Sequence, residues 1–264
     1  MTGDARVQLV VQSDDFGMCH AVNTGVEQAF TEGVLTQVSA MVPCPWFDEA
    51  AELALRHGIP AGMHSTLTCE WDYLRWQPLT GASSLTGPDR TFHRTVAEAR
   101  ASATVEDATA ELVAQAERFL ATGNRLTHID THMGAISIPA YEAVCARFDQ
   151  QFIYPGIRPA YRFASIAGLS DHDADEKKAW LLAHLEKLPP GVNLLVTHCA
   201  EPGPEISSIT GPTSSPWRWA EEYRASDLAT LTDPEVRRRI DELGIELRSV
   251  ADADFPTVVP TGAS

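Results

Sequence analysis

Basic residues are scarce in this chain of 264 residues, which carries 20 Lys and Arg against 36 Asp and Glu and has a formal net charge of −16. Proteins that bind nucleic acid or lie on anionic lipid need a basic surface, so this balance argues against both kinds of partner. The sequence also lacks a run of about 18 consecutive apolar residues, and no membrane span is expected. Its first residues lack the long apolar core of a secretory signal peptide.

Cysteine is sparse and unpatterned. The five cysteines are scattered, their number is odd, and no Cys-x-x-Cys pair occurs. We therefore expect neither a disulfide framework nor a zinc knuckle, and reduced thiols in a cytoplasmic protein are the simplest interpretation. The residues are Cys19, Cys44, Cys69, Cys145 and Cys199.

What the sequence does contain is a repeat of short apolar runs separated by segments with helical periodicity. Its 44% hydrophobic and 21% charged residues are ordinary for a globular chain. Parallel strands need long crossover connections, so the repeat predicts an α/β fold with a mostly parallel sheet, closed or nearly closed into a barrel. The expected strands are Val7–Gln12, Val38–Val42, Ala61–Thr68, Thr127–Thr131, Gly156–Pro159, Asn193–Thr197 and Ile245–Val250.

Helix boundaries and loops complete the expected organisation. Thr104 resembles the first residue of a capping box, and Asp233 followed by Pro234 forms an N-cap with a first-turn proline. Long connections inside a compact domain are more often functional than accidental, and two of them interrupt the repeat, near residues 70–102 and 200–216. Because no linker is apparent, residues 1–264 are expected to form a single domain.

Two adjacent carboxylates, Asp14 and Asp15, directly follow the first expected strand. They repel each other unless a cation or a proton separates their roles. One can then bind a metal ion while the other stays free to act as a base. The same residues also suit an ordinary turn before a helix, and the pattern alone leaves both interpretations open.

A second polar motif, His128, Asp130 and His132, alternates along an expected strand, so its members share one face. Buried imidazole and carboxylate groups need partners, which a metal ion with outer hydrogen-bonding support would supply. The alternative is a solvent-facing strand, although Leu126 and Ile129 give no clean amphipathic contrast.

His64 and His198 each lie on or after an apolar strand, and either one alone is a weak signal. Their combination with the other motifs is stronger, because the carboxyl ends of all strands in a parallel barrel meet at one rim, where active sites lie. An Asp and two His would supply three metal ligands and leave positions open, as in catalytic metal sites. The side chains expected at this rim are Asp14, Asp15, His64, His132, Arg158 and His198.

In their order and spacing, these motifs resemble the YdjC-like carbohydrate deacetylases, a family related to the polysaccharide deacetylases. The resemblance covers nearly the whole chain and includes the runs SDDFG, GMHSTLT, THIDTH, IRP and THCAEPG. It implies a deformed, TIM-barrel-like (β/α) barrel. It also implies a hydrolase that removes acetyl groups from acetylated sugars, typically N-acetyl groups of chitooligosaccharides, with one divalent metal ion.

The resemblance further implies roles for individual residues. Asp14 would take a proton from the attacking water, with Arg158 orienting it. His198 would act from the opposite side, as the acid or as a stabiliser of the oxyanion. A site of one Asp and two His suits zinc or magnesium, and also cobalt or manganese. The implied metal ligands are Asp15, His64 and His132.

Other interpretations stay open at this stage. The protein could be a metal hydrolase of another amide or ester, or a sugar- or metal-binding protein without turnover, although a spare carboxylate beside a metal favours catalysis. A homodimer is expected only because twofold assemblies are common. The loop aromatics could stack on sugar rings or simply pack the loops onto the barrel. These aromatics are Trp71, Tyr73, Trp76 and Trp217.

Overall fold

The computed structural model describes residues 6–210 and 220–255. These residues form an α/β fold around a seven-stranded sheet in which each strand pairs in parallel with its neighbours. The sequence-based prediction of the fold class and of a mostly parallel sheet is confirmed. The strands are β1 (Val7–Phe16), β2 (Gln37–Ala40), β3 (Ala61–Ser65), β4 (Leu126–Thr131), β5 (Ser165–Gly168), β6 (Gly191–Thr197) and β7 (Glu246–Leu247).

The sheet is a barrel that does not close. Its strand order is β4-β3-β2-β1-β6-β5, and β7 pairs with the beginning of β1. Isolated bridges lie beyond the edge strand β4, where Phe152 pairs with Ile129 and with Ala160. This architecture is consistent with the deformed barrel that the family resemblance implies.

The prediction of a strand at Gly156–Pro159 is wrong. The fifth strand lies later, at Ser165–Gly168, and pairs with β6. Prolines at positions 155 and 159 lack a backbone N–H for a ladder, which makes this segment unsuited to a strand inside a sheet. The apolar and β-branched content of the run predicts a strand, but its prolines prevent one.

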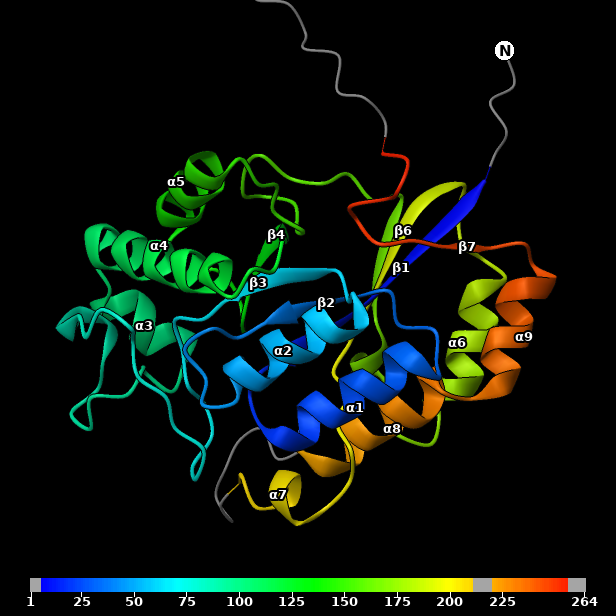
Figure 1. Cartoon of the computed structure of the whole chain (residues 1–264), viewed down its shortest axis with the longest axis horizontal. Coiled ribbons are helices and arrows are strands. Elements are labelled where there is room, and N and C mark those ends of the chain that lie inside the picture. Colours follow the sequence, from blue (N-terminus) through cyan, green and yellow to red (C-terminus); the bar gives the residue numbers. More distant parts are fainter. Residues whose placement is uncertain (1–5, 211–219, 256–264) are drawn as a thin grey trace, which may run out of the picture.

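Helices cover the outside of the sheet. They are α1 (His20–Thr31), α2 (Phe47–His57), α3 (Val96–Ser102), α4 (Val105–Ala121), α5 (Ile138–Phe148), α6 (Lys177–Leu185), α7 (Pro204–Ser207), α8 (Glu221–Leu231) and α9 (Pro234–Glu242), with 3-10 turns η1 (Ser83–Leu85) and η2 (Leu169–Asp171). Helices α1, α2 and α8 lie in front of the sheet in Figure 1, α4 and α5 lie toward β3 and β4, and α6 lies beside α9. Within the described residues, no helix is long and apolar enough to cross a membrane.

The predicted helix starts are confirmed in atomic detail. The Thr104 side chain accepts a hydrogen bond from the backbone N–H of Asp107 at the start of α4. The Asp233 side chain accepts one from the backbone N–H of Glu235, and Pro234 occupies the first turn of α9. Each contact satisfies one of the N–H groups that have no partner inside a helix.

Alternation along β1 separates an apolar core from a polar barrel interior. Leu9 and Val11 belong to the large buried cluster that packs the sheet against the helices. Gln12 is also buried, but its amide bonds two carboxylates, Asp14 Oδ1 at 2.7 Å and Asp130 Oδ2 at 2.8 Å. A layer of hydrogen-bonded polar groups therefore lies inside the barrel, directly below the carboxyl ends of the strands.

Candidate metal centre

The register of the parallel strands gathers the functional side chains at one edge of the sheet. Ser13 of β1 pairs with Thr197 of β6, so Asp14 and His198 come next on neighbouring strands. On the other side of the barrel, His64 of β3 lies beside Asp130 of β4. The predicted convergence on one rim is therefore observed for side chains from four strands.

Asp15 departs from regular strand geometry. Strict alternation would point Asp14 and Asp15 to opposite faces of the sheet. Asp15 instead has a φ of 64°, and the register with β2 shifts between Ser13 and Phe16. Aspartate tolerates this left-handed region better than most residues. As a result, both carboxylates reach His64, each with an oxygen within 4.8 Å of one of its ring nitrogens.

Asp15, His64 and His132 form a compact buried cluster. The Oδ1 atom of Asp15 lies 3.4 Å from Nε2 of His64 and 3.1 Å from Nδ1 of His132. This oxygen is buried and has no hydrogen-bond partner within the described part of the chain, which is unusual for a buried carboxylate. One carboxylate and two imidazoles are a donor set that divalent ions use, so the three residues could hold a metal ion.

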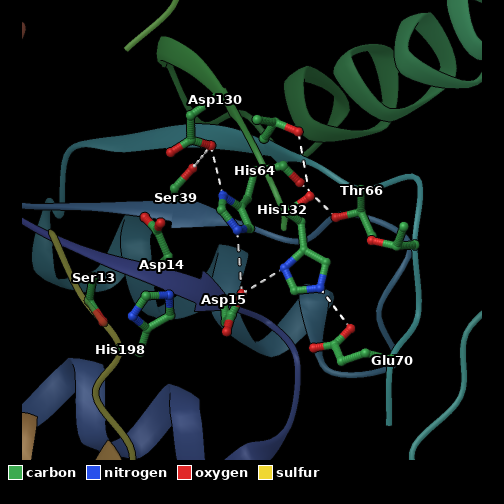
Figure 2. A network of polar contacts seen from close by, with 12 residues as sticks. Ser13, Asp14, Asp15, Ser39, His64, Thr66, Glu70, Asp130, His132 and His198 are labelled. Atoms are coloured by element: carbon green, nitrogen blue, oxygen red, sulfur yellow. Dashed lines mark hydrogen bonds and ion pairs between the residues drawn. The ribbon is translucent and has the colours of Figure 1, made fainter. Parts of the chain in front are cut away.

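Outer carboxylates fix both imidazole rings, as Figure 2 shows. The Nδ1 atom of His64 lies 2.8 Å from Asp130, and Nε2 of His132 lies 2.9 Å from Glu70. Asp130 in turn accepts a hydrogen bond from Ser39 at 2.5 Å. Histidines that bind metals usually give their second ring nitrogen to such a partner, which sets the ring orientation.

Arg224 holds the other oxygen of Asp15. Its Nη2 atom lies 2.6 Å from Asp15 Oδ2, and both side chains are buried. Burial alone would raise the pKa of Asp15, but the Arg224 guanidinium and the two neighbouring imidazoles outweigh burial and hold the pKa well below its usual value. Asp15 is therefore kept ionised, as a metal ligand must be.

The two imidazoles stand in a strongly negative environment. Burial would lower the pKa of His64, yet Asp130 and Asp14 raise it well above its usual value. Burial likewise opposes the charged form of His132, while Glu70 and Asp15 raise its pKa to about 9. The surrounding carboxylates thus favour positive charge at the cluster, which a divalent ion would also supply.

Asp14 stands apart from this ligand set. Its Oδ1 accepts a hydrogen bond from Gln12, and the side chain is buried beside His64 and Asp130. Burial is the main cause that raises the pKa of Asp14 to about 7; His64 opposes the shift, and Asp130 and Asp15 add to it. The structure thus brings a second carboxylate next to the cluster.

A cavity of about 260 Å³ opens above the cluster. Asp15 and His132 line it, together with Trp71, Arg224 and His198. In the view of Figure 2, His198 lies on the side of Asp15 away from His132. Burial lowers the pKa of His198 to about 3. A small molecule in this cavity would contact Asp15, His132 and His198 together.

Arg158 is not at this cluster. It is exposed, lies on the loop before β5 and lines a separate cavity of about 690 Å³ with its neighbours in the loop. No hydrogen bond joins it to Asp14 within residues 6–210 and 220–255, where Asp14 accepts one from Gln12. The misplaced strand explains the difference, because Arg158 was expected at the end of a strand that does not form.

Several contacts of the site could not be found by motif reading. Glu70 lies two residues after the GMHSTLT run, but nothing in the sequence pairs it with His132. Arg224 lies in the middle of α8, and no local pattern marks it as a partner of Asp15. Asp130 is different, because alternation within THIDTH places it in the polar layer. Glu70 and Arg224 reach the site only through the folding of the chain, so no sequence pattern marks them.

The loop aromatics divide into different environments. Trp71 is fully buried and lines the cavity. Trp76 is also buried, and its indole N–H donates to the carbonyl of Thr68 at 2.9 Å, which packs the loop onto the barrel. Tyr73 is 71% exposed. Trp217 lies outside the described residues.

The fold and the site together define an α/β-barrel protein with a buried Asp–His–His cluster at the carboxyl edge of its sheet. The chain belongs to the YdjC-like protein family, whose sequence pattern matches residues 8–242. The resemblance of the sequence motifs to this family is thereby confirmed.

Individual relatives agree with this membership, and a solved structure shares the fold. A carbohydrate deacetylase from Geobacillus stearothermophilus is 30% identical over 246 residues, covering 90% of this chain and 94% of the relative. A chitooligosaccharide deacetylase from Yersinia pestis is 28% identical over 265 residues, covering 92% of this chain and 98% of the relative. A crystal structure from Enterococcus faecalis, described as a candidate cellobiose-phosphate cleavage protein, matches with a TM-score of 0.76 at 22% identity, covering 93% of this chain and 98% of that one.

Proposed function

We propose that the protein is a metal-dependent carbohydrate deacetylase that removes acetyl groups from acetylated sugars, with N-acetyl groups of chitooligosaccharides as the first substrates to test. Two relatives that align along almost their full lengths are named carbohydrate deacetylase and chitooligosaccharide deacetylase. The observation that carries the proposal is the buried Asp15 Oδ1, which has no hydrogen-bond partner among the described residues but faces two imidazole nitrogens beside a second carboxylate.

In this proposal, Asp15, His64 and His132 hold one divalent ion. Magnesium or zinc is favoured, with cobalt or manganese as alternatives, because all four accept mixed oxygen and nitrogen ligands. When bound, such an ion would polarise the acetyl carbonyl and acidify the attacking water. Asp130 and Glu70 orient the two rings, and Arg224 keeps the Asp15 carboxylate in place.

The remaining groups handle protons. Asp14 is a carboxylate adjacent to the ligand set, so it can accept a proton from the attacking water. Hydrolysis of an amide also requires a proton on the departing nitrogen and stabilisation of the oxyanion. His198, on the cavity wall, is proposed to serve one of these two needs. Arg158, exposed on its loop, is not proposed to take part.

The test is acetate release from diacetylchitobiose by the purified protein, with and without a chelator. We expect release that the chelator abolishes and that one of the four divalent ions restores. A protein that binds the sugar but releases no acetate with any of these ions would be a binding protein, and the proposal would fail. Acetate release that the chelator leaves unchanged would remove the metal from the proposal.

A further inference from the structure

A second buried polar network lies against His198. It contains Ser170 of η2, Lys177 at the start of α6 and Asp227 of α8. The side chains of Lys177 and Asp227 are fully buried, and Ser170 is 6% exposed. Two consecutive elements, η2 and α6, and the distant helix α8 thus meet next to the histidine that follows β6.

The hydrogen bonds of this network run in a defined direction. Lys177 donates to Asp227 Oδ1 at 2.6 Å and to the carbonyl of Tyr223 at 2.7 Å. Asp227 Oδ2 accepts the Ser170 hydroxyl at 2.6 Å and the backbone N–H of His198 at 2.7 Å. Both oxygens of the carboxylate are therefore occupied, and the proton of the Ser170 hydroxyl is committed to one of them.

This direction determines the contact between Ser170 and the histidine ring. The Oγ of Ser170 lies 3.0 Å from Nδ1 of His198. A serine hydroxyl has a single proton, so once that proton is given to Asp227, the oxygen can only accept. The ring must then carry its proton on Nδ1. In the neutral ring Nε2 is then a hydrogen-bond acceptor, and it can pass a proton to the departing nitrogen only after it has taken one up.

The cost of the network suggests that it does more than stabilise the fold. A buried ion pair usually gains little net stability over an apolar pair of similar size, because both charges lose their hydration. Here Asp227, paired with Lys177, accepts hydrogen bonds from the Ser170 hydroxyl and from the backbone N–H of His198. It therefore fixes the backbone of His198 directly and the imidazole ring through Ser170.

We propose that Ser170, anchored by Asp227 and Lys177, is a positioning residue that holds His198 with its proton on Nδ1 and directs Nε2 to the substrate. This inference rests on the proposed deacetylase function for its kinetic consequence, but the state of the ring can be measured without a substrate. The same chain of contacts also ties the position of His198 to α6 and α8.

The experiment combines two readouts on the full chain. In ¹⁵N-histidine-labelled protein, the chemical shifts of His198, assigned with His198→Gln, should show the proton on Nδ1. Ser170→Ala should remove this preference and lower kcat on diacetylchitobiose by about 10- to 100-fold, the usual effect of losing an outer-shell partner, with KM and metal content nearly unchanged. Ser170→Thr keeps the hydroxyl and should restore most of the loss.

Ser165→Ala provides a matched control. Ser165 lies on neighbouring β5 and donates a hydrogen bond to Asn193 at 2.7 Å, so the variant also deletes a serine hydroxyl contact but does not touch His198. Ser165→Ala should leave both the position of the proton on the His198 ring and kcat unchanged. A proton on Nε2 in the unmodified protein would overturn the inference even if Ser170→Ala failed to fold, as would unchanged kinetics in Ser170→Ala. Absence of all activity with the expected ring state would instead contradict the proposed function alone.

Discussion

At the scale of single residues, two adjacent carboxylates occupy different positions at the site, and the proposed function gives them different roles. In a regular strand, Asp14 and Asp15 would point to opposite faces of the sheet, and only one of them could reach the site. The positive φ of Asp15 turns it into the cluster while Asp14 stays in the polar layer of the barrel. A conformation of this kind costs on the order of 1–3 kcal/mol and is typical of functional sites.

This division predicts the effect of Asp14→Asn. The amide has nearly the same size but cannot accept a proton, so turnover should fall by about 10²- to 10⁴-fold. Metal content, measured by elemental analysis, should stay unchanged, because Asp14 is not assigned as a ligand. Asp48→Asn, which changes an 80% exposed aspartate, is the control and should keep full activity. Near-normal turnover of Asp14→Asn would disprove its role as the base.

Arg224 is a second residue with a distinct expected phenotype. Replacing it by Met would leave Asp15 Oδ2 without its charged partner in a buried site. Removing one partner of a buried ion pair costs about 3–5 kcal/mol, so the free energy of unfolding should fall by a similar amount. Metal affinity, measured by calorimetric titration, should fall about 10- to 100-fold. An unchanged affinity would show that Arg224 does not position Asp15.

Much of the cluster could be predicted from the sequence because strand alternation is regular. Alternation placed Asp130 and His132 on one face, and the common edge of parallel strands placed His64 with them. Arg224 could not be found in this way, because its contact with Asp15 spans more than 200 positions and depends on the docking of α8. The position of Arg158 could not be predicted from the apolar content of its run, because the prolines on either side prevent the strand.

At the scale of elements, the fit between β3 and β4 depends on a residue without a side chain. A Cβ atom built on Gly62 would lie 2.2 Å from Nε2 of His128, far closer than atoms can approach. Gly62 thus allows the buried His128 ring to lie over β3, two residues before His64. The spacing of these strands, and with it the distance between the ligands they carry, depends on this contact.

A double-mutant cycle tests this dependence. Gly62→Ala should lower the free energy of unfolding by about 1–3 kcal/mol through overpacking. In the double variant Gly62→Ala/His128→Ala the ring is gone. The loss of unfolding free energy in this variant should therefore be smaller than the sum of the losses in the two single variants. Chemical denaturation of the four proteins gives the coupling. Gly87→Ala is the control, since its Cβ would meet Asp89 at an ordinary 3.5 Å. Strict additivity would refute the steric explanation.

At the scale of the whole molecule, a metal ion at this site would join β1, β3 and the end of β4. Any ligand that binds only the folded state stabilises it, by about 2.7 kcal/mol at 100 times its Kd. Thermal unfolding should therefore shift to lower temperature when a chelator is added. His132→Ala should unfold at the same temperature with and without chelator. A shift of full size in this variant would place the metal elsewhere.

The strand that carries both aspartates also has an unusual place in the order of synthesis. The beginning of β1 pairs with β7, and Gln8 bonds Glu246, which lies 238 positions later. During synthesis, β1 therefore completes its pairing only after β7 has been made, 238 positions after Gln8. The strand that carries both aspartates thus gains its last neighbour late in assembly.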